Sequence, residues 1–246
     1  MNKEPVLFFP LIDLDKQEKS LTQVEQVINR LRADIISGRL LPAAKLSITT
    51  LAEESGVSLG AVREALASLA AEDLVVAEPQ RGYRVSPVSS QSLSDLAQAR
   101  IEIESLCLTE AIKHGDLQWE SACIAALDQL RKVDSVVVGD CHELADAKSR
   151  AHAKFHYALA SGCNNQWLLR MQRALYQQSE RYRRLTVPLV GRGRDVDGEH
   201  KALLQAMLDR DPDRARKLLT QHLLTTARDL LTSPLLTQDM RSGGPT

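Results

Sequence analysis

Residues 51–74 read LAEESGVSLGAVREALASLAAEDL and decide the fold of the N-terminal part of the chain. A short helical stretch over about residues 49–55 leads into the tight turn 56–58, which contains a glycine. Ser58 can then cap a second helix over about residues 59–71. Two short helices joined by such a turn are typical of a helix-turn-helix.

The sequence on either side extends this motif. Upstream, apolar residues recur at helical spacing from about Leu21 until Gly38. Downstream, the apolar runs 74–77 and 82–85 flank a polar turn and indicate a small β-hairpin. Three helices plus this hairpin predict a winged helix-turn-helix over residues 21–87, preceded by an extension over residues 1–20.

Everything beyond a serine-rich linker at residues 88–94 has a helical pattern. We expect an all-α antiparallel bundle over residues 95–232, and a flexible tail over residues 233–246. Its expected helices are roughly Ser94–Lys113, Leu117–Val133, His142–Ser161, Gln166–Leu185, Asp195–Arg210 and Asp211–Thr232. The fold class is therefore mainly α.

A helix-turn-helix suits DNA because the N-terminal end of its second helix reaches base edges in the major groove. Here that end carries Arg63, which can pair with guanine or grip a phosphate. A wing tip with Gly82 can approach the minor groove closely. The candidate DNA-binding residues are Lys45, Thr49, Ser58, Leu59, Gly60, Arg63, Arg81, Gly82 and Arg84.

The net charge of −1 argues in the other direction, because phosphate-binding proteins are usually basic. Residues 1–87 hold 10 Lys and Arg against 12 Asp and Glu. The cations that contact DNA must therefore be few, and they must be concentrated on one face of the unit. We expect weak binding by one head, and specificity that depends on a homodimer.

Composition excludes several other classes of protein. The chain of 246 residues is 43% hydrophobic and 26% charged, which is typical of a globular protein. No apolar run approaches the roughly 20 residues of a membrane span, and no signal peptide is recognisable. Four cysteines without a C-x-x-C pair fit reduced thiols. These features predict a cytoplasmic protein that does not bind a membrane.

Four of the six histidines are placed where they can meet. His152 and His156 lie one helical turn apart, while His200 and His222 belong to the last two expected helices. In an antiparallel bundle the four rings can converge and bind a metal ion. They can also be separate histidines with ordinary partners, and the spacing alone leaves both interpretations open.

The N-terminal motif resembles the GntR family of bacterial transcription regulators, in particular at Val57-Ser58 and at Val62-Arg63-Glu64-Ala65-Leu66. The resemblance implies that Arg63, Ser58 and the pair Arg81-Gly82 contact an operator. The family usually has a basic residue where this chain has Leu59, and a proline where it has Ala61. The departure at Leu59 suggests an altered operator.

Residues 92–232 resemble the FCD effector-binding domain of the FadR-type GntR regulators, through Phe155-His156 and the run His200-Lys201-Ala202-Leu203 among others. This resemblance implies metal ligation by His156, His200 and His222, with His152 where the family mostly has Asp. A four-nitrogen site favours Zn or Ni. Arg100 and Asn165 are the implied effector-binding residues. The arginines of residues 181–184 are interpreted as a solvated or interface face.

These features predict a ligand-responsive regulator rather than an enzyme. A homodimer would bind a palindromic operator on double-stranded DNA, controlled by a small carboxylate bound in the helical domain, beside a divalent metal. The alternative is a helical metalloenzyme with an accessory DNA-binding domain. The pair His152/His156 lacks the glutamate of H-E-x-x-H, and no nucleophile or acid–base pair accompanies the histidines.

Overall fold

The computed structural model describes residues 21–136, 141–186 and 194–237, so the expected extension over residues 1–20 lies outside the described residues. The chain divides into two compact units, Met1–Val88 and Ser89–Thr246, and each has a hydrophobic core of its own. Among the helices described, none is both long and apolar enough to cross a bilayer.

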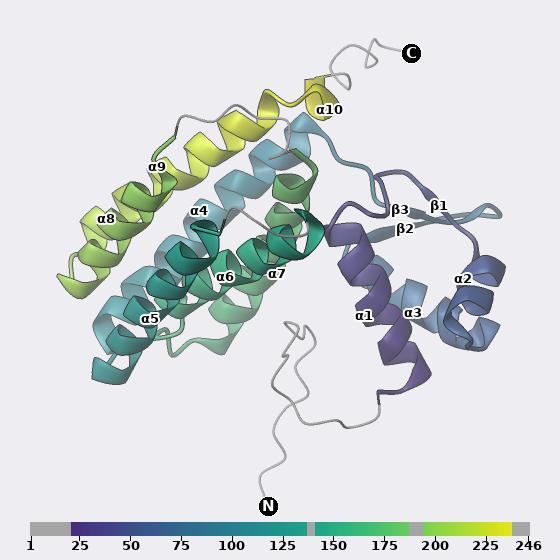
Figure 1. The fold of residues 1–246 in the computed structure, drawn as a ribbon, viewed down its shortest axis with the longest axis horizontal. Coiled ribbons are helices and arrows are strands. Elements are labelled where there is room, and N and C mark those ends of the chain that lie inside the picture. Colours follow the sequence, from purple (N-terminus) through teal and green to yellow (C-terminus); the bar gives the residue numbers. More distant parts are fainter. Residues whose placement is uncertain (1–20, 137–140, 187–193, 238–246) are drawn as a thin grey trace, which may run out of the picture. The chain divides into compact units, whose positions relative to one another are not determined.

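The first unit is a winged helix-turn-helix (Figure 1). Its elements are α1 (Gln23–Ile36), β1 (Lys45–Leu46), α2 (Ile48–Ser55), α3 (Leu59–Ala71), β2 (Val75–Glu78) and β3 (Gly82–Val85). Helix α1 starts with a capping box between Thr22 and Glu25. It packs on α3, and side chains such as Ile35 and Leu66 are fully buried between them.

The turn between α2 and α3 has the local chemistry that the sequence predicts. Gly56 ends α2 at φ +63°, a left-handed conformation that glycine adopts without strain. Two residues later the Ser58 hydroxyl accepts a hydrogen bond from the Ala61 N–H at 3.1 Å and caps α3. The predicted helix-turn-helix is confirmed.

The sheet has three strands instead of the two expected. Strand β3 lies in the middle, antiparallel to both β1 and β2, in the order β1-β3-β2. Strand β1 has only two residues, which is too short for an alternating pattern to be visible in the sequence. Its Leu46 is buried in the core, which explains why the extra strand forms.

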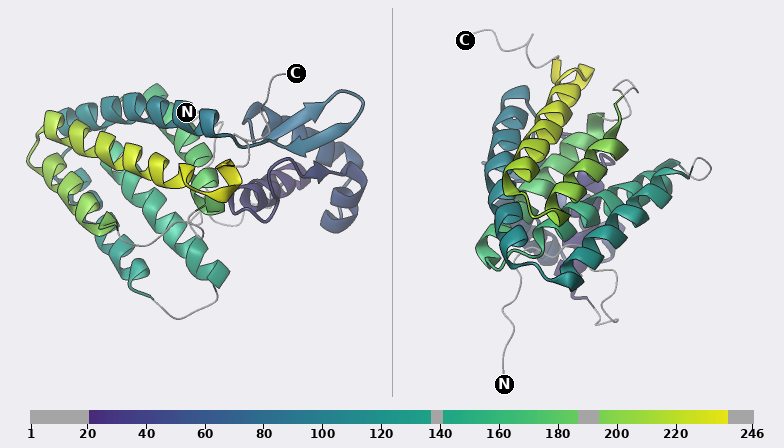
Figure 2. Two further views of the ribbon diagram at one scale, coloured as in Figure 1. Left: turned by 90° about the horizontal axis from the view of Figure 1, so that it is seen from above. Right: turned by 90° about the vertical axis from the view of Figure 1, so that its left-hand side faces the viewer.

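The second unit is a bundle of helices (Figure 2). They are α4 (Ser90–His114), α5 (Leu117–Asp134), α6 (Cys141–Ala160), α7 (Gln166–Thr186), α8 (Val196–Leu208), α9 (Pro212–Leu231) and the short α10 (Pro234–Thr237). Helix α4 lies along α7 and α9, α5 lies along α6, and α8 packs on α5 and α9. The core centres on large side chains such as Phe155, Met207 and Leu219. The predicted fold class is confirmed.

Two segments differ from the expected boundaries. Helix α4 begins at Ser90, inside the expected linker 88–94, because the Ser89 hydroxyl caps it and Leu93 is buried. Part of the expected flexible tail forms α10. There Leu236 is fully buried, and its carbonyl accepts a hydrogen bond from the Ser90 hydroxyl at 3.0 Å.

Candidate metal centre and nucleic-acid interface

The structure brings the four predicted histidines together in the second unit. Helix α6 supplies His152 and His156, one turn apart, while α8 supplies His200 and α9 supplies His222. One ring nitrogen of each lies within 4.8 Å of those of the other three. All but the half-buried His152 are buried. Imidazole nitrogens are common ligands of transition metals, so this cluster is a candidate metal centre.

The hydrogen bonds around the rings leave nitrogens available at the centre. The Nε2 atoms of His156 and His200 are buried and have no hydrogen-bond partner. Such orphaned polar atoms are rare in folded proteins, and a bound ion would satisfy them. The donor set and these orphaned atoms therefore fit a transition metal.

Outer partners orient two of the rings. The Nδ1 of His222 lies 2.8 Å from Glu199 Oε2, and the Nδ1 of His152 lies 2.7 Å from the Tyr176 hydroxyl. A neutral ring that donates through Nδ1 keeps the lone pair of its Nε2 for a metal. Glu104 Oε2 lies 3.9 Å from the Nδ1 of His156. None of these three residues was predicted from the sequence as a partner of a histidine, because no motif marks that role.

Burial favours the neutral form of three of the four imidazoles. Burial, reinforced by neighbouring imidazoles, lowers the pKa of His152 and His156 well below 6.5, and lowers that of His200 to about 3. Burial alone would raise the pKa of Glu199. Hydrogen bonds from His222 and Arg194 outweigh it and lower that pKa to about 2. Neutral imidazole is the form that binds metal ions.

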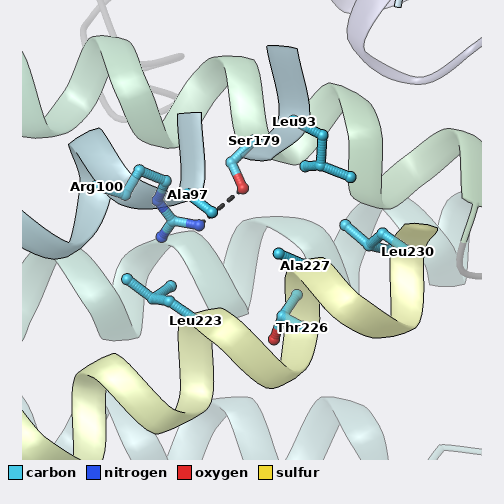
Figure 3. Close-up of a pocket in the computed structure, with 8 residues that line it drawn as sticks. All are labelled: Leu93, Ala97, Arg100, Ser179, Leu223, Thr226, Ala227 and Leu230. Carbon is cyan, nitrogen blue, oxygen red and sulfur yellow. Dashed lines mark hydrogen bonds between the residues drawn. The ribbon is translucent and has the colours of Figure 1, made fainter. Parts of the chain in front are cut away.

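Arg100 lies on α4 beside this centre and is buried. Its Nε donates to Glu104 Oε1 and its Nη1 donates to the Ser179 hydroxyl, each at 2.7 Å. Its guanidinium carbon is 5.1 Å from the centre of the Tyr176 ring. Figure 3 shows Arg100 and Ser179 at the wall of a small cavity that is otherwise lined mostly by aliphatic side chains of α4 and α9.

The cavity has a volume of about 10 Å³, which is room for one water molecule. An organic acid therefore needs side chains to move before it can contact Arg100. Asn165, the other predicted effector contact, is exposed at the start of α7. Its Oδ1 accepts hydrogen bonds from the backbone of Trp167 and Leu168, so its observed role is that of a helix cap.

In the first unit, the leading end of α3 presents the predicted recognition residues. Ser58, Leu59, Gly60 and Arg63 are all exposed. Ser58 is occupied as the helix cap, while Leu59 is 45% exposed. Within the described part of the chain, Arg63 forms no ion pair. Its guanidinium is thus available for DNA.

The predicted wing residues divide into two groups. Arg81 and Gly82 are exposed at the tip, where Gly82 has φ +92°, a conformation that favours glycine. Arg84 instead pairs with Glu78 at 2.9 Å and donates to the Ala43 carbonyl at 3.1 Å. Its guanidinium thus braces the sheet, and a direct DNA contact by Arg84 stays a prediction. Lys45 and Thr49 are exposed on β1 and α2.

Comparisons with known families match both units. The family model described as "Bacterial regulatory proteins, gntR family" matches residues 23–85, and the model described as "FCD domain" matches residues 95–225. The solved structure "E. coli McbR/YncC" aligns with a TM-score of 0.70 over 85% of this chain and 97% of that chain. At 22% identity, this likeness concerns the fold.

Two curated proteins are similar over most of their length. The "Uncharacterized HTH-type transcriptional regulator BphR" of Paraburkholderia xenovorans (strain LB400) is 39% identical over 200 residues, which cover 81% of this chain and 82% of that protein. The "HTH-type transcriptional repressor GlaR" of Escherichia coli (strain K12) is 36% identical over 199 residues, which cover 79% of this chain and 90% of that protein.

Proposed function

Since the chain belongs to the GntR family of bacterial transcription regulators and carries an FCD domain, we propose that it binds a palindromic operator as a homodimer under the control of a small organic acid. The acid binds in the second unit, beside a divalent metal. The relatives are transcription regulators, so the alternative of a metalloenzyme with an accessory DNA-binding domain is not retained.

The orphaned Nε2 atoms of His156 and His200 are the observation that carries the metal-assisted part of this proposal. With His152 and His222 they offer four ring nitrogens, a set that favours Zn or Ni over Mg or Mn. Such an ion, when bound, is a Lewis acid that attracts a carboxylate. The protein's part is to hold the rings in one tautomer, through Glu199 and Tyr176.

Arg100 is the group we propose for the effector carboxylate. A buried guanidinium makes strong paired hydrogen bonds to a carboxylate, and Arg100 already makes one to Glu104. An incoming acid would take the place of this glutamate on the fork. Glu104 would then be free to accept a hydrogen bond from the nearby Nδ1 of His156.

On DNA, Arg63 would contact a base or a phosphate in the major groove, and Arg81 would contact DNA from the tip of the wing. The exposed Leu59 would contact a thymine methyl where a basic residue would contact guanine. Effector binding need only favour one arrangement of the two heads by about 1–3 kcal/mol to change operator affinity 5- to 150-fold.

The test is a comparison of three properties of purified protein: its metal content, its operator binding and its response to candidate acids. His156→Ala should lose the metal and the response to acid, and should still bind operator. His114→Ala, an exposed-end histidine on α4 outside the centre, is the matched control. An H156A protein that keeps both metal and response would refute the role of this centre.

A further inference from the structure

The segment of chain that joins the two units is anchored at both of its ends. In the first unit, the Ser86 N–H donates to the Leu74 carbonyl at 3.0 Å. In the second unit, the Ser89 N–H donates to the hydroxyl of the buried Tyr182 on α7 at 3.4 Å. Residues 87–88 lie between these two positions, and the first of them is a proline, whose ring fixes φ. The linker between the anchored positions is therefore very short.

Helix α10 holds the next residue of α4. The Leu236 carbonyl accepts a hydrogen bond from the Ser90 hydroxyl at 3.0 Å, across 146 residues of sequence. The side chain of Leu236 is fully buried, and so is Ser233 at the turn into α10. Figure 1 shows this short helix at the end of α9, near the start of α4. Helix α10 therefore anchors the first turn of α4, directly after the linker.

One side chain of α10 accounts for its docking. Pro234 cannot continue α9, because it has no N–H for the helical hydrogen bond, so the chain turns there. Leu235 is then 47% exposed, whereas the next residue, Leu236, has no exposed surface. A helix of four residues is not stable alone in water. The burial of Leu236 is therefore what keeps α10 in place.

Helix α10 also connects the two helices that supply most of the lining of the cavity in Figure 3. Leu93 of α4 lines this cavity, three residues after Ser90. Leu230 of α9 lines it too, three residues before Ser233. The contact between α10 and α4 thus lies next to the end of the cavity that is nearer to the linker.

We propose that α10 is a strap that keeps the linker between the units short, and that the protein binds a palindromic operator less tightly when the strap is lost. The inference rests on the proposed function as a homodimer. Without the strap, the first turn of α4 can unwind as far as the buried Leu93. The free stretch then grows from residues 87–88 to residues 87–92, and is about threefold longer. The effective concentration of the second head at its half-site falls roughly as the −3/2 power of linker length, so affinity should fall about fivefold.

The experiment compares Leu236→Asp with Leu235→Asp in the full-length protein. A charge at the buried position 236 should release the strap, whereas the same charge at the exposed position 235 should not. The DNA probes are a palindrome selected by the wild-type protein from random-sequence duplexes, and the same duplex with one half-site scrambled. L236D should bind the palindrome about fivefold more weakly than the wild type and the half-site within about twofold. L235D should match the wild type on both duplexes.

Amide hydrogen exchange tests the strap without DNA. In L236D, peptides that cover residues 87–97 should exchange at least about tenfold faster than in the wild type, while peptides from α5 should be unchanged. A second pair of variants avoids the buried charge. A chain that ends at residue 232 lacks α10 and should behave as L236D does, whereas a chain that ends at residue 237 keeps α10 and should behave as the wild type. Sedimentation velocity and thermal melting are recorded for each variant.

Three outcomes would overturn the inference: unchanged exchange at residues 87–97 in the chain without α10, equal losses of affinity for the palindrome and the half-site, or equal effects of L235D and L236D. The proposed function fails separately, if the wild-type protein binds the palindrome no more tightly than the half-site. If the wild type prefers the palindrome and loss of α10 leaves that preference unchanged, the proposed function stands and the strap inference falls.

Discussion

Acidification of metal-free protein should destabilise the second unit, because the centre suppresses protonation of its histidines. Burial lowers the pKa of His200 to about 3, whereas the unfolded chain has the ordinary 6.5. Between these values the unfolded state binds more protons than the folded state, so stability rises with pH and is lost as the pH falls from 6.5 towards 3.

The size of the effect follows from the pKa difference. At pH 5 the unfolded-state pKa lies 1.5 units above the pH, which at about 1.4 kcal/mol per unit gives a loss of about 2 kcal/mol from His200 alone. His152 and His156 act in the same direction. Glu199 does not contribute in this range, because its pKa shifts from 4.5 to about 2 and it titrates below pH 5.

Tryptophan fluorescence is a suitable probe, because both tryptophans of the chain, Trp119 and Trp167, lie in the second unit. Urea unfolding of chelator-treated protein is followed at pH 7.5, 6 and 5. His200→Gln should reduce the loss between pH 7.5 and 5 by about 2 kcal/mol, whereas His114→Gln should not change it. A free energy of unfolding that stays flat over this range would refute the reasoning.

Three further predictions concern the first unit. Arg63→Ala should weaken operator binding at least tenfold in a band-shift assay and leave the melting temperature of the unit unchanged. Arg84→Ala removes the ion pair with Glu78, so it should lower the melting temperature and have the smaller effect on operator affinity. The logarithm of operator affinity should fall with the logarithm of salt concentration with a slope no steeper than about −5, since Arg63 and few other exposed cations among residues 21–88 are unpaired. A titration giving a slope near −10 contradicts this. Arg32→Ala should destabilise the unit by about 3 kcal/mol, because it removes the 2.6 Å ion pair between the buried Arg32 guanidinium and Glu72. Urea unfolding followed by circular dichroism should show the double variant Arg32→Met/Glu72→Leu to be milder.

The sequence predicted those parts of the molecule that depend on local spacing. The turn at Gly56 and the cap at Ser58 could be predicted because glycine is preferred in a left-handed turn and serine is preferred as a helix N-cap. The meeting of His152 and His156 follows from a one-turn separation on a helix. The approach of His200 and His222 depended on how the helices pair, which the antiparallel bundle supplied.

Contacts between distant segments were not predictable in this way. The arginines of residues 181–184 were interpreted as a solvated or interface face, because arginine is usually exposed. Only the packing of α6 against α7 reveals that Arg183 pairs with Glu180, which is bound by Ser149. Arg84 is a residue type that often contacts DNA, but in the structure its guanidinium forms an ion pair with Glu78 on the neighbouring strand. Asn165 was assigned through resemblance, whereas its side chain completes the first turn of α7.

The polar interior face of α7 has a consequence for folding. Its buried residues include Ser179 and Glu180, which gain little from leaving water until Arg100 on α4 and Ser149 on α6 are in place. We therefore expect α7 to join the bundle late, and its amides to exchange with solvent sooner than those of the apolar core around Phe155. A ligand that bridges this helix to its neighbours would act by completing the folding of the domain.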